Sequence, residues 1–182
     1  MKKIFLYVSI LSVSLLTTID TNAQQKFPKM DVSPMDAASY PTNWREANKL
    51  VKVVYSRPQL KGRELEKLAP KGKVWRTGAN EAAEITFYSD VNFGGKDIAA
   101  GTYSLFSIPG DDEWTVIISN QRNIWGSYFY KEAEDVARVT ASVSESDENI
   151  EAFSIVFDGE EDNATMHMGW GKLIVSVPVE KK

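Results

Sequence analysis

Apolar and polar side chains alternate along most of this chain in short runs that end at turn residues. Between residues 83 and 89, Ile85 and Phe87 stand at every second position among polar neighbours. Side chains of a β-strand point to opposite faces in turn, so this alternation predicts a strand with one buried face. Other runs rich in strand-forming residues predict further strands at 49–55, 101–108, 114–119, 137–144, 152–157, 165–170 and 172–179.

Turn residues predict how these strands are connected. Gly94-Gly95 is typical of a tight hairpin, and the cluster at 109–113 predicts a second hairpin between its flanking strands. Many short strands at regular spacing predict an all-β fold, an antiparallel β-sandwich of about nine strands. Short helical turns are expected at residues 44–48, 64–68 and 131–135.

The first residues have the pattern of a secretory signal peptide. Lys2 and Lys3 precede an apolar run, and small residues end at Ala23. The apolar run is shorter than the roughly 20 residues of a membrane-spanning helix, and no second long run follows. The sequence therefore predicts a signal peptide at 1–23, and a soluble periplasmic or secreted protein without membrane insertion after cleavage.

Composition narrows the classes of function. The formal net charge is −4, so the chain lacks the basic surface that nucleic-acid binding requires. Cysteine is absent, which excludes disulfides, thiol nucleophiles and thiolate metal sites. The three prolines of the first mature residues indicate an extended lead-in at 24–48, followed by one β-sandwich domain at 49–182.

The stretch from Val74 to Glu81 combines an aromatic ring, a cation, an amide and a carboxylate around Gly78. In a binding site, arginine would pair with carboxylates or phosphates and tryptophan would stack on a sugar ring. In a structural loop, Arg76 would instead pair with Glu81, and Trp75 would fill the core. Trp125 lies beside Gly126 in a long aromatic connection, where we expect partial exposure and a place near a cavity or sheet edge. The candidate ligand-binding residues are Arg57, Arg63, Trp75, Arg76, Asn80, Glu81 and Trp125.

Catalytic and metal chemistry have weaker support. The chain has one histidine, His167, and no Gly-x-Ser-x-Gly elbow, so no catalytic triad is predicted. A hydrolase could use Glu81 as acid or base with Arg76 stabilising negative charge, but no partner carboxylate is specified. The acidic turns at 111–113 and 158–163 lack the ligand spacing of a known calcium loop. We therefore predict no metal and no cofactor.

Several short motifs follow one another along the chain. They are Ser56-Arg57-Pro58, Lys61-Gly62-Arg63, Gly72-Lys73-Val74-Trp75-Arg76-Thr77-Gly78-Ala79-Asn80-Glu81, Asp90-Val91, Ala100-Gly101-Thr102-Tyr103-Ser104-Leu105-Phe106, Trp114-Thr115-Val116-Ile117 and Trp125-Gly126. In this order they resemble the DUF2911 family of uncharacterised exported proteins, which is widespread in Bacteroidetes. The resemblance extends from about Lys49 to Val179, and the run from Trp75 to Glu81 is its most specific part. The resemblance implies an exported single domain and brings no activity, substrate or cofactor.

Three functions remain open on the sequence. The residues favour a domain that binds a small carbohydrate or anion, or that has an accessory role in the cell envelope. The alternatives are the carbohydrate- or ester-directed hydrolase that uses Glu81 and Arg76, and a purely structural or protein-interaction domain. A pocket into which Arg76, Asn80 and Glu81 point would favour the first two functions, and a second carboxylate about 5–10 Å from Glu81 would favour the hydrolase. Side chains that pair only with one another under packed aromatic rings would favour the structural role.

Overall fold

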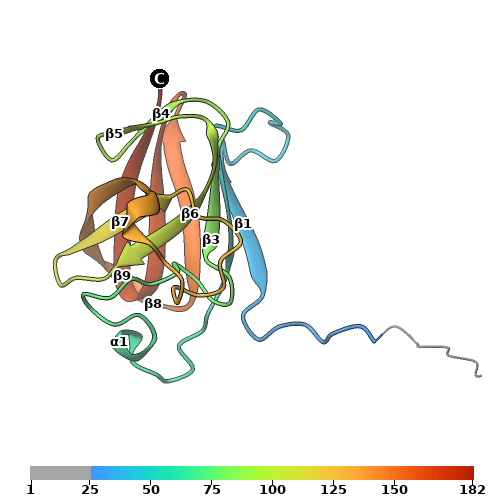
Figure 1. Cartoon of the computed structure of the whole chain (residues 1–182), viewed down its shortest axis with the longest axis vertical. Helices are drawn as coiled ribbons and strands as arrows, with labels where there is room; N and C mark the ends of the chain where they lie inside the picture. The colour runs from blue at the N-terminus through green and yellow to red at the C-terminus, as the bar shows by residue number, and fades with distance from the viewer. Residues whose placement is uncertain (1–25) are drawn as a thin grey trace, which may run out of the picture.

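In the part of the chain that the structure describes, nine β-strands form one antiparallel sheet in the order β1-β2-β3-β6-β7-β8-β9-β4-β5 (Figure 1). The structure is a computed structural model that describes residues 26–182, so the predicted signal peptide lies outside the described residues. The elements are β1 (Met35–Tyr40), β2 (Val51–Ser56), α1 (Leu65–Leu68), β3 (Ala83–Phe87), β4 (Val91–Phe93), β5 (Lys96–Ile98), β6 (Gly101–Ile108), β7 (Glu113–Ser119), a 3-10 helix (Glu132–Glu134), β8 (Asp135–Glu160) and β9 (Asn163–Lys181).

The long hairpin of β8 and β9 folds the sheet over its own apolar face. The pairing of these strands shifts register between Glu145 and Ile150 and again before Ser154. The first part of β8 pairs with β7, whereas its later part lies against β2. There the Tyr55 hydroxyl accepts a hydrogen bond of 2.8 Å from the Ile155 backbone N–H. The two ends of the sheet thus face each other across one core, as in a sandwich.

Strand alternation produces this core directly. In β3, Ala83, Ile85 and Phe87 are buried and the residues between them are partly exposed. The large, fully buried side chains come from many strands, and include Phe87, Phe93, Phe106, Phe153, Ile117 and Met166. Burial of each such side chain stabilises the fold by about 1.5–3 kcal/mol. The prediction of an antiparallel all-β sandwich of about nine strands is therefore confirmed.

The predicted turns and helices are mostly confirmed. Gly94 and Gly95 have φ angles of 55° and 86° and join β4 to β5, as a tight hairpin requires. β6 and β7 form the second hairpin. Helical turns occur as α1 and the 3-10 helix. The prediction of a helical turn at 44–48 is wrong, because no helix forms there. The chain makes one tight turn, in which the Glu46 N–H donates to the Asn43 carbonyl.

The strand boundaries differ from the predicted ones in two respects. Met35–Tyr40, within the expected lead-in, forms edge strand β1 through six residue pairs with β2, although it is poor in strand-forming residues. The four predicted strands after residue 136 are only two strands, because pairing continues across the polar breaks with shifts in register. Within the described residues, no helix is long and apolar enough to cross a membrane.

Candidate functional site

The loop from Val74 to Glu81 is fixed against the sheet by its backbone. Trp75 and Ser107 exchange two backbone hydrogen bonds of 2.7 and 2.9 Å. Thr77 is fully buried, and its hydroxyl lies 2.9 Å from the Ser107 hydroxyl. At Gly78 a Cβ atom would lie 3.0 Å from the carbonyl oxygen of Ser56, so the close approach to β2 favours glycine. This part of the loop therefore belongs to the packed interior.

Trp75 lies at the centre of an aromatic cluster and is 4% exposed. Its ring stacks on Trp170 at 5.3 Å between centroids and meets Phe153 edge-on at 5.0 Å. Trp114 lies 6.2 Å away, also edge-on. A ring covered on these sides cannot present a face to a sugar. Of the two roles considered for Trp75, the structure supports the core role.

The two arginines before this loop both form hydrogen bonds within the protein, and Arg57 joins two strands. The guanidinium of Arg57 donates to Asp36 of β1 at 3.0 Å and to the Phe153 carbonyl and Ser154 hydroxyl of β8. Arg63 donates to the carbonyls of Leu60 and Gln59 in its own turn. Both side chains are thus occupied by structural contacts away from the Trp125 loop, and the structure does not bring them into one site.

Arg76, Asn80 and Glu81 also differ from the expected arrangement. The structural interpretation of the loop paired Arg76 with Glu81 or a nearby carboxylate. Within the described residues Arg76 forms no ion pair, and its Nε is buried without a hydrogen-bond partner. Asn80 adopts a left-handed φ of 62°, and its carbonyl accepts the N–H of Gly126 at 2.8 Å. Glu81 is exposed and its backbone pairs with that of Trp125. The Trp75–Glu81 loop therefore supports the Trp125 loop.

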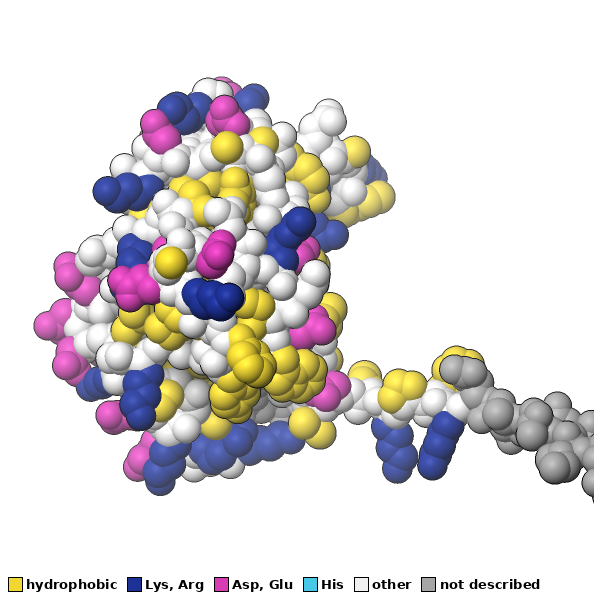
Figure 2. Space-filling model, in the orientation of Figure 1, with side chains coloured by type: hydrophobic (Ala, Val, Ile, Leu, Met, Phe, Trp, Pro, Cys, Tyr) yellow, Lys and Arg dark blue, Asp and Glu magenta, His cyan; other side chains and the backbone are white. Residues whose placement is uncertain are grey.

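The Trp125 loop, residues 120–131, carries the most exposed aromatic side chains of the folded domain's loops after Trp44. Trp125, Tyr128 and Phe129 are 58%, 78% and 72% exposed. Figure 2 shows hydrophobic side chains gathered on the face where this loop runs between β7 and β8. A groove of about 640 Å³ opens beside them. Its lining residues are Gln121, Arg122, Asn123, Ile124, Trp125, Phe129, Lys131 and Glu134.

Side-chain and backbone contacts hold the Trp125 loop in place. The Gln121 amide donates to the Phe129 carbonyl at 3.0 Å and accepts the Lys131 N–H at 2.6 Å. Tyr130 packs edge-on against Phe106 at 5.1 Å, and its hydroxyl bonds to Asp135. Burial and the hydrogen bond with Asp135 raise the pKa of Tyr130 to about 12. The exposed aromatic rings therefore stand on a fixed backbone.

A family comparison adds to this geometry. Residues 33–179 match the sequence profile described as "Protein of unknown function (DUF2911)". The chain belongs to the DUF2911 family. The matched segment includes β1 and most of β9, so the family region begins earlier than the resemblance at Lys49 indicated. Neither the search of curated proteins nor that of solved structures finds a match to the DUF2911 chain.

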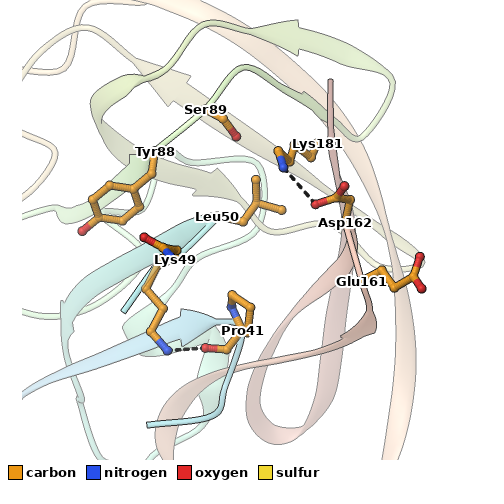
Figure 3. Close-up of a pocket in the computed structure, with 9 residues that line it drawn as sticks. Pro41, Lys49, Leu50, Tyr88, Ser89, Glu161, Asp162 and Lys181 are labelled. Atoms are coloured by element: carbon orange, nitrogen blue, oxygen red, sulfur yellow. Dashed lines mark hydrogen bonds and ion pairs between the residues drawn. The ribbon is translucent and has the colours of Figure 1, made fainter. Parts of the chain in front are cut away.

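A second recess of the DUF2911 domain, of about 190 Å³, lies where the β1–β2 connection meets the β8–β9 turn (Figure 3). Leu50 is at its centre. Lys49 donates to the backbone carbonyls of Pro41 and Asn43, and Lys181 pairs with Asp162 at 3.2 Å. Because both ammonium groups already have partners, this recess is a weaker ligand site than the groove beside Trp125.

The carboxylates near the Trp75–Glu81 loop give little support to a hydrolase. Glu81 and Glu84 both line a recess of about 200 Å³ together with Tyr55 and Ser56. A general acid is normally kept protonated by an apolar, buried environment. Glu81 is instead exposed to solvent, and the Arg76 side chain does not line this recess.

His167 takes part in a side-chain contact between strands. Its Nδ1 lies 2.8 Å from the Ser176 hydroxyl, and its Nε2 lies 3.1 Å from Asp158 Oδ1. These are the residue types of a catalytic triad, yet none of the three lines the groove beside Trp125 or either of the two recesses described above. The arrangement connects β8 with two parts of β9.

The acidic turns are paired with lysines instead of being grouped for a metal. Lys71 pairs with Asp111, and Lys181 with Asp162. Across residues 26–182, no group of three or more histidine, aspartate or glutamate side chains could hold a metal ion.

The sequence predicted the partial exposure of Trp125 but did not indicate the residues beside it. Arg122, Phe129 and Lys131 line the groove, and none of the three was a candidate. The many aromatic residues between 120 and 135 could have indicated this surface. Exposed apolar side chains that gather in one place often mark a binding site. Nothing in the sequence singled out Arg122 and Lys131, because isolated arginines and lysines occur throughout the chain.

Proposed function

We propose that this DUF2911 domain is an exported carbohydrate-binding domain of the cell envelope, and that it binds through the groove beside Trp125. The observation that carries the proposal is the set of exposed rings at Trp125, Tyr128 and Phe129, which a hydrogen-bonded backbone holds at the edge of a groove. Aromatic faces are apolar surfaces on which a pyranose ring can stack, and neighbouring polar groups select its orientation.

The shape and composition of the surface favour a small ligand over a protein partner. Asn123, Arg122 and Glu134 place amide and charged groups in the same groove as the two aromatic residues Trp125 and Phe129. A few polar groups among apolar ones are typical of small-molecule sites. Backbone bonds from Asn80 and Ala82 to the loop reduce the ordering cost of binding, since less freedom remains to be lost.

Binding of a panel of neutral and acidic oligosaccharides, measured by calorimetry and tryptophan fluorescence, tests this function. We expect Trp125→Ala to weaken binding at least about 10-fold, or about 1.4 kcal/mol, without lowering the melting temperature. Trp44→Ala is the matched control, because Trp44 is 83% exposed but lies outside the groove. Equal losses in the two variants would contradict the assignment of the site. Absence of glycan binding, with a self-association that Trp125→Ala abolishes, would indicate a protein interface instead.

A further inference from the structure

Charge in the Trp125 groove differs from that of the whole chain. Of its eight lining residues, Arg122 and Lys131 are basic and Glu134 alone is acidic. The chain as a whole has a formal net charge of −4. The groove is thus a locally basic region on an acidic protein.

Neither cation of the groove has an internal partner. Within residues 26–182, neither the Arg122 guanidinium nor the Lys131 ammonium forms an ion pair or a side-chain hydrogen bond. Of the acidic side chains nearby, Asp135 and Glu132 are paired with Arg138 at 2.8 Å and 3.4 Å, and Glu134 forms no ion pair with either cation in the described part of the chain. Two cations therefore remain available to an anion that enters the groove.

We infer that the groove binds an anionic pyranose, a sugar ring that carries a carboxylate or a sulfate. The ring would stack on Trp125 or Phe129, and its anionic group would bond to Arg122, whose planar fork matches two oxygens at once. Lys131 adds a second positive charge. This inference rests on the proposed carbohydrate-binding function and specifies its ligand class.

Salt dependence follows from the exposure of the groove. Charges near a protein surface interact strongly at low ionic strength and are screened beyond about 10 Å at 0.1 M salt. Affinity for an anionic sugar should therefore fall as salt is raised. Affinity for a neutral sugar of the same ring structure should change little, because stacking does not depend on charge.

The test compares three ligands of equal length on the full-length purified protein: an oligogalacturonate, its carboxyl-reduced galactan, and a sulfated galactan. We expect at least one anionic ligand to bind at least about 10-fold more tightly than the neutral one, because its anionic group would form charge-assisted hydrogen bonds with Arg122. Arg122→Gln and Lys131→Gln should bring the anionic ligand close to the affinity of the neutral one. Lys73→Gln, an exposed lysine outside the groove, is the control and should have no effect.

The possible results separate the two proposals. The tighter of the two anionic ligands identifies the group as carboxylate or sulfate. Equal binding of neutral and anionic ligands, with loss only in Trp125→Ala, overturns the anionic specificity and leaves carbohydrate binding intact. No binding of any ligand overturns both. An equal loss in Lys73→Gln and Arg122→Gln would also overturn the inference, since it would reflect overall charge and not this groove.

Discussion

Trp75 and Trp125 show how side chains of one type acquire different roles at the residue scale. Trp75 is 4% exposed and contacts three aromatic rings, whereas Trp125 is 58% exposed at the edge of a groove. Both lie in loops of mixed polarity, next to a polar or glycine residue. Burial therefore depends on where each loop meets the sheet, which the local pattern does not show.

Replacement of Trp75 by alanine should strongly destabilise the fold. Removal of a buried tryptophan leaves a cavity, and such substitutions cost about 3–5 kcal/mol in the free energy of unfolding. Urea denaturation of Trp75→Ala measures this loss. Trp44→Ala removes an exposed ring of the same type, and we expect a change within about 0.5 kcal/mol. A Trp75→Ala variant as stable as Trp44→Ala would show that the aromatic cluster does not stabilise the core.

Two loops act as one unit at the element scale. The Trp75–Glu81 loop is bonded to β6, and it in turn bonds the Trp125 loop through the Asn80 carbonyl and the Glu81 backbone. A motif that is specific in sequence can thus hold a neighbouring site in place without touching a ligand. Asn80 suits its left-handed backbone, because asparagine adopts positive φ angles more readily than most residues. Thr77 also has a positive φ, which β-branched residues rarely adopt, and its buried hydroxyl contacts that of Ser107.

Gly126 is a position in the Trp125 loop where both the backbone angle and a close neighbour favour glycine. Its φ is +68°, and a Cβ atom would lie 2.7 Å from the Tyr128 ring. We expect Gly126→Ala to lower stability by about 1–2 kcal/mol, and also to displace the aromatic side chains and reduce glycan affinity. Gly95→Ala meets the same left-handed strain, with φ of +86° and no atom within 4 Å. It should cost similar stability in thermal unfolding and leave affinity unchanged; a loss of affinity in Gly95→Ala would contradict this.

At the scale of the whole molecule, the proposed function depends on the fold that carries the groove and on export of the protein. The sheet encloses one core, and the groove lies on the connection between β7 and β8. Export is part of the proposed function, and it would depend on the predicted signal peptide at 1–23.

Cleavage of the signal peptide tests this part of the proposal. Expression of the full chain, followed by cell fractionation and intact-mass measurement, should give an exported protein that begins at Gln24. Signal peptidase reads small residues at the positions of Thr21 and Ala23. We expect Ala23→Phe to block processing, whereas Asn22→Phe, at the position between them, should be processed normally. An unprocessed parent protein in the cytoplasm would contradict the proposed location.

Much of the fold could be predicted from the sequence because strand alternation is a local property. The two-residue period of Ile85 and Phe87 is present in the sequence itself, and so is the need for left-handed residues at Gly94-Gly95. β1 could not be predicted, since its six residues form a strand only because β2 offers paired backbone groups. The number of strands after residue 136 likewise depends on where register shifts are tolerated.

The sequence by itself determined the fold class, the hairpin turns and the partial exposure of Trp125. Only the tertiary structure decided which polar residues share a surface. Arg57 and Arg63 are occupied by backbone and side-chain partners, some of them about 97 residues away, whereas Arg122 and Lys131 remain unpaired beside Trp125 within the described chain. A residue type specifies which bonds a side chain can form, but partners distant in sequence determine whether it forms them inside the protein or remains free for a ligand.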